Sequence, residues 1–383
     1  MKYFIIAGEA SGDLHASNLM RELQRIDLKA EFCFLGGDLM QAQAQGGNMV
    51  KHYRQMAFMG IVTVLKNAKT VLKNIIDCKR AMIDFQPDIL VLIDYPSFNL
   101  RMARFSKENL DAKVYYYISP KIWAWKEFRV KQIKRYVDKM FTIFPFETAF
   151  YAKHNYQVEY VGNPTIDTIC NRPNQQQTFN EFCTENNLPE KPIIAILAGS
   201  RKQEILGCIS RMIDAGLCFP EYQVVIAGAP GIDVELYNSI LKGKNVSIVF
   251  EKTYELLQHS KAAVVNSGTA TLETALMGIP QVVVYHVPLG RIGFLVKEIV
   301  VQIKFVSLVN IVAEKLVVKE LLAHLFTVEN IATELERMLE DKNYRQTMLN
   351  EYLIIKKSLG GEGAALCAAD GIISIYNTQI AKK

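Results

Sequence analysis

The chain has 383 residues, of which 50% are hydrophobic and 22% are charged, and its formal net charge is +5. This composition is typical of a globular protein and excludes a disordered or fibrous chain. The length exceeds what one hydrophobic core usually serves, so two domains are expected. The most apolar stretch, residues 292–312, is interrupted by Lys297, Glu298 and Lys304 and lacks the roughly 20 uninterrupted apolar residues of a spanning helix. We therefore expect a soluble or peripheral protein of the cytoplasm.

The N-terminal part of the chain alternates short β-rich runs with helical patterns. Met1 is followed at once by the apolar run 2–7, which predicts a first strand rather than a signal peptide. Further strands are expected at 31–35, 88–93, 113–118, 139–143 and 158–161, with helices such as 14–25 and 71–85 between them. This alternation predicts a first domain over 1–165 with a parallel sheet covered by helices on both faces.

The alternation pauses and then begins again. Residues 166–192 are rich in Asn, Gln, Pro and Glu, which predicts a linker or peripheral segment. Strands expected at 193–197, 223–226, 246–250, 262–265 and 281–284 define a second domain over 193–345. Residues 346–383 are expected to be helices that pack back on the first domain or on a partner subunit. The sequence thus predicts an α/β protein with two doubly wound, Rossmann-like domains facing a cleft, and a helical C-terminal tail.

The first candidate site is the loop Gly8–Asp13, which lies between a strand and a helix. Its backbone N–H groups could receive a phosphate or a sugar hydroxyl, which makes Glu9, Ser11, Gly12 and Asp13 candidate binding residues. The glycine spacing matches neither the dinucleotide fingerprint nor a Walker loop. The alternative is a tight turn capped by Ser11 or Asp13.

Asp94 ends the very apolar run 89–93 and is followed by Tyr95 and Pro96. At the carboxyl end of a buried strand, partial loss of solvent raises the pKa of a carboxyl group and makes it a usable general base. The alternative is an aspartate that caps a turn or a helix, which is common beside proline.

Two further loops belong to the second domain. Gly199, Ser200 and Arg201 follow its first strand, where a guanidinium beside a helix start would bind a diphosphate. The segment 265–273 runs from a strand into a helix that begins with small residues, so a ligand could approach the amides of Ser267, Gly268 and Thr269. Glu273, one turn into that helix, could accept from ribose hydroxyls. A simple capping arrangement is the alternative.

No metal site or cofactor is expected. The chain has no Asp-x-Asp sequence, its six histidines have no zinc-ligand spacing, and its seven cysteines form no Cys-x-x-Cys pair. Gly-x-Ser-x-Gly is also absent, which argues against a lipase-type hydrolase.

A membrane contact is expected around residues 59–73, where an apolar face is edged by lysines. The candidate residues are Ile61, Val62, Val64, Leu65, Lys66, Lys69, Leu72 and Lys73. Such a face suits an interfacial helix on anionic lipid. The alternative is an ordinary amphipathic helix that covers the sheet. A second cluster of basic residues, between Lys121 and Lys139, would suit phosphates, anionic lipid or nucleic acid, or would simply be a solvated helix face.

Several short segments occur in the order found in the bacterial lipid A disaccharide synthases, and the chain resembles that family over nearly its whole length. The segments are Ala7–Asp13, Met59–Val62, Ile93–Asn99, Ser119–Trp125 with Arg129, Phe144–Glu147, Gly199–Arg201 and Ser267–Thr269. The resemblance implies the GT-B fold, with an acceptor-binding N-terminal domain and a C-terminal domain that holds a uridine diphosphate (UDP) sugar. It also implies transfer of 2,3-diacylglucosamine from UDP to the 6-hydroxyl of 2,3-diacylglucosamine 1-phosphate, with inversion.

The resemblance assigns roles to particular residues. Asp94 would be the catalytic base, Arg201 would bind the diphosphate, and Asn310 would be an active-site asparagine. Ser119, Trp123 and Arg129 become candidates on the acceptor side. Two positions depart from the family pattern: Ser97 stands where many relatives have a second acidic residue, and Val309 where many have proline. The expected mechanism therefore relies on one carboxylate.

The resemblance also implies partners and a location. The partners are the two lipid substrates and the anionic inner-membrane surface, with no nucleic acid, and a homo-oligomer is compatible with the resemblance. The location is cytoplasmic, peripheral on the inner face of the inner membrane of a Gram-negative bacterium. Other interpretations are another GT-B enzyme (a peptidoglycan N-acetylglucosaminyl transferase or a UDP-sugar 2-epimerase) and a catalytically silent UDP-sugar or lipid-binding protein.

Overall fold

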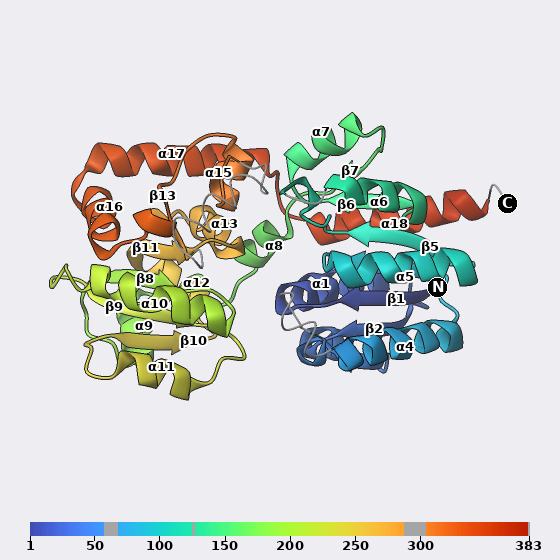
Figure 1. The fold of residues 1–383 in the computed structure, drawn as a ribbon, viewed down its shortest axis with the longest axis horizontal. Coiled ribbons are helices and arrows are strands. Elements are labelled where there is room, and N and C mark those ends of the chain that lie inside the picture. Colours follow the sequence, from blue (N-terminus) through green and yellow to red (C-terminus); the bar gives the residue numbers. More distant parts are fainter. Residues whose placement is uncertain (57–67, 125–126, 287–303, 382–383) are drawn as a thin grey trace. The chain divides into compact units, whose positions relative to one another are not determined.

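The computed structural model describes residues 1–56, 68–124, 127–286 and 304–381 (Figure 1). It divides into two compact units, of which the first contains Met1–Asp167 with Leu359–Lys383 and the second contains Thr168–Ser358. The sequence-based boundaries differ from this division mainly at the end of the chain. The helix at 342–358 belongs to the second unit, and only the last helix belongs to the first.

The first unit is built on a seven-stranded parallel sheet with the order β3-β2-β1-β4-β5-β6-β7. The strands are β1 (Lys2–Ala7), β2 (Glu31–Gly36), β3 (Asn48–His52), β4 (Ile89–Ile93), β5 (Lys113–Tyr117), β6 (Lys139–Thr142) and β7 (Glu159–Tyr160). The central strands β1 and β4 are almost entirely buried, since helices cover both faces and leave their apolar runs no solvent.

The described helices of the first unit follow their strands as a doubly wound fold requires. They are α1 (Ala10–Ile26), α2 (Asp38–Gln43), α4 (Ala68–Phe85), α5 (Pro96–Asn109), α6 (Val130–Tyr136), α7 (Pro145–Lys153) and α18 (Ala364–Ile380), and α8 (Pro164–Cys170) crosses the boundary to the second unit. Although α18 comes from the end of the chain, it packs against α1 and lies among the elements of this unit (Figure 1). Asp167 accepts from the amides of Gly363 and Ala365 and so fixes the start of α18.

The second unit has a six-stranded parallel sheet with the order β10-β9-β8-β11-β12-β13. Its strands are β8 (Ile193–Leu197), β9 (Gln223–Gly228), β10 (Ser247–Phe250), β11 (Ser260–Asn266), β12 (Gln281–Tyr285) and β13 (Glu320–Leu322). Its described helices are α9 (Phe179–Glu185), α10 (Lys202–Gly216), α11 (Val234–Leu241), α12 (Thr253–Gln258), α13 (Thr269–Leu276), α15 (Leu308–Ala313), α16 (Val328–Glu340) and α17 (Lys342–Ser358). The prediction of two doubly wound α/β units with a helical C-terminal segment is confirmed.

Some elements differ from the sequence-based expectation. Within the stretch interpreted as a linker, α9 places Phe182 and Cys183 in the core of the second unit, although polar residues surround them in the sequence. The short edge strands β3 and β13 were not predicted, because an edge strand needs only a few residues and little apolar periodicity.

Candidate active site

Each sheet has a switch point, where chain order reverses and where ligands of doubly wound sheets bind at the carboxyl ends of the strands. In the first unit β1 pairs with β2 on one side and with β4 on the other. In the second, β8 pairs with β9 and with β11. The loops after β1 and β4 hold Gly8–Asp13 and Asp94, and those after β8 and β11 hold Gly199–Arg201 and Ser267–Thr269. Each unit therefore gathers its predicted loops at its own switch point.

The two loops of the first unit are in close contact. The ring of Tyr95 lies over Gly8 so tightly that a Cβ at Gly8 would meet Tyr95 Cγ at 2.4 Å. Only glycine fits there. Tyr95 Oη donates to the carbonyl of Met56, and burial raises the pKa of Tyr95, with the nearby charge of Glu9 acting in the same direction. Glu9 is thus close to the turn that carries Asp94.

The turn after β4 has an unusual backbone. Asp94 and Tyr95 have φ angles of 41° and 45°, and Ile118, at the end of the adjacent β5, has 65°. Positive φ is uncommon outside glycine and is a clear outlier for a β-branched residue. Such conformations persist only where surrounding contacts impose them, and they cluster at functional sites.

Three side-chain contacts impose this turn. Asn99 Nδ2 donates to the carbonyls of Ile93 and Asp94 at 3.1 and 2.8 Å, and Tyr116 Oη donates to the carbonyl of Asp94. Asn99 and Tyr116 are fully buried. Burial raises the pKa of Tyr116, and the charge of Asp94 raises it further. The phenol therefore remains a proton donor to the turn.

Arg129 approaches the same turn from the segment before α6. Its Nη2 donates to Ser97 Oγ at 3.0 Å, three residues after Asp94. Partial burial lowers the pKa of Arg129, and Tyr116 opposes that effect. The structure therefore brings Arg129 to the first turn of α5, directly after Asp94, and the charges of both residues act on Tyr116.

Ser119 and Trp123 lie beside a buried carboxyl group, that of Glu147. Ser119 Oγ is hydrogen-bonded to Tyr151 Oη at 2.8 Å, and the Trp123 ring packs edge-on against Phe146. Glu147 accepts from the amides of Ile143 and Phe144, and burial raises its pKa to about 7.

The predicted loop Gly8–Asp13 is shorter in the structure, because α1 begins at Ala10, and its residues have different environments. Ser11 is exposed, and Glu9 occupies the N-cap position of α1 without a side-chain capping bond. Gly12 is buried. Asp13 is buried, and its two oxygens accept from the amides of residues 37, 39 and 40. Its carboxylate is therefore occupied by the start of α2.

In the second unit, the loop after β8 is closely packed against neighbouring side chains at Gly199. Gly199 has a φ of +113°, and a Cβ there would meet Asn266 Nδ2 and Glu204 Oε2, both at 2.8 Å. Glu204 Oε2 accepts from the amide of Ser200, and its Oε1 pairs with Arg201 Nη1 at 2.7 Å. The Arg201 side chain is about half exposed, at 47%. Glu204 thus orients Arg201 at the surface of the loop.

The loop after β11 leads into α13. Ser267 donates its hydroxyl proton to the carbonyl of Val306, while Gly268 and Thr269 are exposed at the start of the helix. Glu273 lies one turn further, where Tyr254 Oη donates to its Oε1 at 3.0 Å. The amide end of α13 and a partly buried carboxylate thus lie on one helix, as nucleotide binding would require.

Asn310 is fully buried, and other groups of the chain occupy its amide. Its Oδ1 accepts from the amides of Val317 and Val318, and its Nδ2 donates to the Val318 carbonyl and to Glu320 Oε1. Glu320 also accepts from the amides of residues 306 and 307 and from the Ser307 hydroxyl. Asn310 and Glu320 together fix the segment 306–310 against β13.

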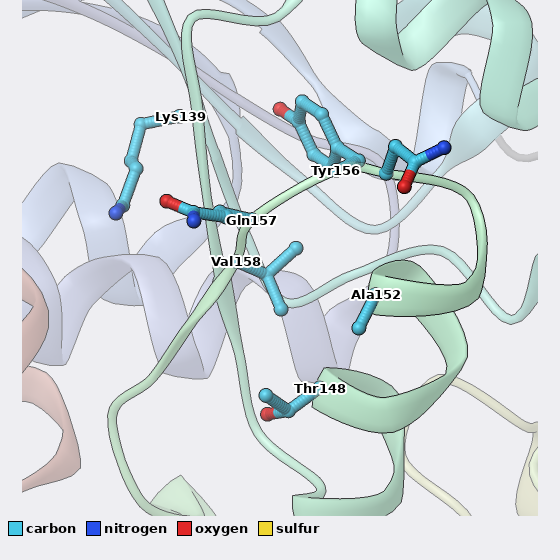
Figure 2. Close-up of a pocket in the computed structure, with 7 residues that line it drawn as sticks. Lys139, Thr148, Ala152, Tyr156, Gln157 and Val158 are labelled. Atoms are coloured by element: carbon cyan, nitrogen blue, oxygen red, sulfur yellow. The ribbon is translucent and has the colours of Figure 1, made fainter.

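A pocket of about 580 Å³ lies elsewhere in the first unit, between the start of β6, α7 and the segment 155–158 (Figure 2). Lys139, which lines it, is the first residue of β6. Because the strands are parallel, this is the edge of the sheet opposite to Asp94, so the pocket is separate from the candidate site.

The expected membrane segment is described only in part. Ile61, Val62, Val64, Leu65 and Lys66 lie outside the described residues. Lys69, Leu72 and Lys73 are exposed on α4, whose other face packs on the core. Among the described helices, none has the length and apolar character needed to cross a membrane.

The residues that support the predicted ones were not among the candidate site residues from the sequence. Tyr116, Glu147, Glu204, Tyr254 and Glu320 all contact a predicted residue or its loop. The run 113–117 contains three consecutive tyrosines in a buried strand, which was the available signal for Tyr116. The other contacts depend on register and helix orientation, which a single sequence does not fix.

The paired doubly wound units, with loops gathered at both switch points, define the GT-B class. The structure of UDP-GlcNAc 2-epimerase from Neisseria meningitidis bound to UDP-GlcNAc is similar, with a TM-score of 0.69 over 98% of this chain and 100% of that chain. The sequence identity is 15%, so this similarity concerns the fold alone.

Sequence comparison identifies the family. The family model described as Lipid-A-disaccharide synthetase matches residues 3–370. The lipid-A-disaccharide synthase of Myxococcus xanthus is 37% identical over 380 residues, which are 98% of this chain and 97% of that protein. The lipid-A-disaccharide synthase of Geobacter metallireducens is 34% identical over 370 residues, which are 95% of this chain and 94% of that protein. The chain belongs to the lipid-A-disaccharide synthase family, which confirms the resemblance and disfavours the alternative interpretations.

Proposed function

We propose that this chain is a glycosyltransferase that joins UDP-2,3-diacylglucosamine to 2,3-diacylglucosamine 1-phosphate, giving lipid A disaccharide 1-phosphate with a β-1,6 linkage, and UDP. The observation that carries the proposal is the family match over 3–370. The fold supports it, because each unit has a separate switch point at which one substrate could bind.

Asp94 is the proposed catalytic base. It removes the proton from the acceptor hydroxyl while that oxygen attacks the anomeric carbon of the donor, and the bond to UDP breaks on the opposite side. The strained turn, held by Asn99 and Tyr116, supports this role, since it fixes the position of Asp94 at the end of β4. Arg129, bonded to Ser97, would contact the acceptor beside it.

The second unit is proposed to bind UDP. Arg201 and the amides at Gly199, Ser200, Gly268 and Thr269 would stabilise the charge that develops on the departing diphosphate. Glu273 would accept from the ribose. Asn310, whose amide is occupied within the chain, is proposed to act by holding the segment 306–310 in place.

We further propose that the protein works peripherally on an anionic membrane, through the exposed face of α4 and the residues before it. A lipid-linked acceptor must be taken from a bilayer, which makes such contact useful. The proposed location is the inner-membrane surface that the family resemblance implies, and the relatives named lipid-A-disaccharide synthase are bacterial proteins. A homo-oligomer is part of the same proposal.

The test is product analysis. The protein is mixed with UDP-diacylglucosamine and diacylglucosamine 1-phosphate in detergent micelles, and the lipids are examined by mass spectrometry. A disaccharide monophosphate supports the proposal. Unchanged substrates would instead indicate a binding protein, and a changed sugar epimer would indicate an epimerase.

A further inference from the structure

The carboxylate of Glu273 is held from one side only. Tyr254, in the first turn of α12, donates its hydroxyl proton to Glu273 Oε1 at 3.0 Å. Helix α12 precedes β11 and α13 follows it, so this bond connects the two helices that flank one central strand. Among the described residues, Glu273 Oε2 has no hydrogen-bond partner. One oxygen of the carboxylate is thus fixed, and the other is available.

A second tyrosine–glutamate pair in the same unit is arranged differently. Tyr344 on α17 donates to Glu334 Oε1 on α16, but Glu334 Oε2 also pairs with Arg337, at 3.4 Å. Both oxygens of Glu334 are therefore used, as expected for a pair that only joins two helices. Glu273 has no cation partner among the described residues. Joining two helices therefore does not account for its second oxygen.

The position of Glu273 suits a sugar hydroxyl. Helix α13 begins at Thr269, and Glu273 lies four residues later, which corresponds to about 6 Å along the helix. A nucleoside diphosphate whose phosphates bind at the helix start would place its ribose about one turn along it. Vicinal hydroxyls are donors, and an ionised carboxylate oxygen is the acceptor that binds them best.

The tyrosine also maintains the charge of this carboxylate. Burial raises the pKa of Glu273, and the hydrogen bond from Tyr254 lowers it. Burial and the nearby Glu273 charge both raise the pKa of Tyr254, so the phenol stays protonated and continues to donate. Without the phenol, Glu273 would lose both its orientation and part of its preference for the ionised form.

We propose that Tyr254 is a positioning residue for the nucleotide: its hydroxyl holds Glu273 so that Oε2 accepts from the ribose hydroxyls, and this makes the site selective for ribose over 2′-deoxyribose. The inference rests on the proposed function, because it requires UDP to bind in the second unit.

Calorimetric titration with UDP and 2′-deoxy-UDP tests the inference on the wild type, Tyr254→Phe, Glu273→Gln and the double variant. The wild type should prefer UDP. Tyr254→Phe should weaken UDP binding about tenfold, the effect of losing a hydrogen bond to a charged group, while 2′-deoxy-UDP binding changes much less. The double variant should bind UDP no more weakly than Glu273→Gln, because both changes remove one interaction.

Tyr344→Phe is the matched control, since it breaks a tyrosine–glutamate bond of the same chemistry in the same unit. It should leave the affinity for both nucleotides unchanged. If Tyr254→Phe keeps the full preference for UDP, or weakens both nucleotides equally, the positioning role is overturned while the proposed function stands. If the wild type binds neither nucleotide, the inference and the proposed function fall together.

Discussion

Tyr116 Oη donates to the backbone carbonyl of Asp94, so a phenol buried on β5 helps to fix the left-handed turn at the end of β4. The hydroxyl does not need to touch a substrate to affect catalysis. The hydroxyl fixes the conformation of the turn, and this conformation sets the orientation of the Asp94 carboxyl group.

Tyr116→Phe should lower kcat roughly threefold to tenfold and leave KM for both substrates nearly unchanged, since one net hydrogen bond contributes about 1 kcal/mol. The matched control is Tyr117→Phe on the same strand. The Tyr117 hydroxyl is buried without a hydrogen-bond partner among the described residues, so its removal should cost no activity and no stability. Equal kcat in the two variants would show that the Tyr116 bond does not position Asp94.

Asp94→Asn preserves the shape of the side chain but removes the ability to take a proton. We expect turnover to fall by roughly a hundredfold to ten-thousandfold. UDP affinity should persist, because the proposed UDP residues belong to the second unit. Single-turnover kinetics measure the chemical step, and Asp84→Asn, on the exposed surface of α4, is the control. Near wild-type turnover at every pH would make Asp94 a capping residue.

The sequence was sufficient for the central strands of both sheets and for the positions of the loops that follow them. Buried parallel strands such as 2–7, 89–93 and 193–197 are short, continuous apolar runs, and the residues directly after them lie at the carboxyl edge by geometry. That is why Asp94 and Gly199–Arg201 could be selected before any contact was known.

Contacts between elements could not be predicted in the same way. Asp13 looked like a ligand-binding residue, but three amides of the loop before α2 and its first turn occupy its carboxylate. Those amides are more than 20 residues away in the sequence, and only the pairing of β1 with β2 brings them close. The support of Asn310 by Glu320 depends likewise on the unpredicted strand β13.

Glu147 should make stability depend on pH. Its carboxyl group is buried, and its pKa rises from 4.5 to about 7, so the folded state favours the protonated form. The resulting stabilisation is fully present below the unfolded value of about 4.5 and is lost as the pH rises through 7. Glu147→Gln carries no charge at any pH. Between pH 5 and 8 the wild type should therefore lose about 2 to 3 kcal/mol relative to this variant.

Urea denaturation at several pH values measures this difference. Glutamine can still accept from the amides of Ile143 and Phe144, which both donate to one oxygen of Glu147, so the variant should fold. Glu235→Gln, at an exposed position of α11, should track the wild type at every pH. A constant difference between the wild type and Glu147→Gln would contradict the buried, titrating carboxyl group.

Asn310 and Glu320 should act as one unit. Asn310→Ala and Glu320→Ala each release the segment 306–310, so each should lower turnover, and the double variant should be little worse than the more damaged single variant. The corresponding coupling energy is about 1 to 2 kcal/mol. Asn330→Ala, which breaks an exposed side-chain bond on α16, is the control. Fully additive losses would mean that Asn310 contacts a substrate independently of Glu320.

The exposed face of α4 should bind anionic lipid. Lys69 and Lys73 are exposed there, and so are the apolar residues Leu72, Ile76 and Ile83, with exposed fractions of 59%, 50% and 47%. The double variant Lys69→Glu/Lys73→Glu should weaken binding to phosphatidylglycerol vesicles by at least about 2 kcal/mol, roughly thirtyfold, because each basic residue near such a surface contributes about 1 kcal/mol. Co-sedimentation with these vesicles at low salt measures the change in binding.

The control variant Lys356→Glu/Lys357→Glu makes the same change of charge on α17 and should have little effect on vesicle binding. Turnover in detergent micelles should be preserved in both variants, because neither pair belongs to the candidate site. If vesicle binding falls equally in both, only net charge matters, and α4 is an ordinary helix that covers the sheet.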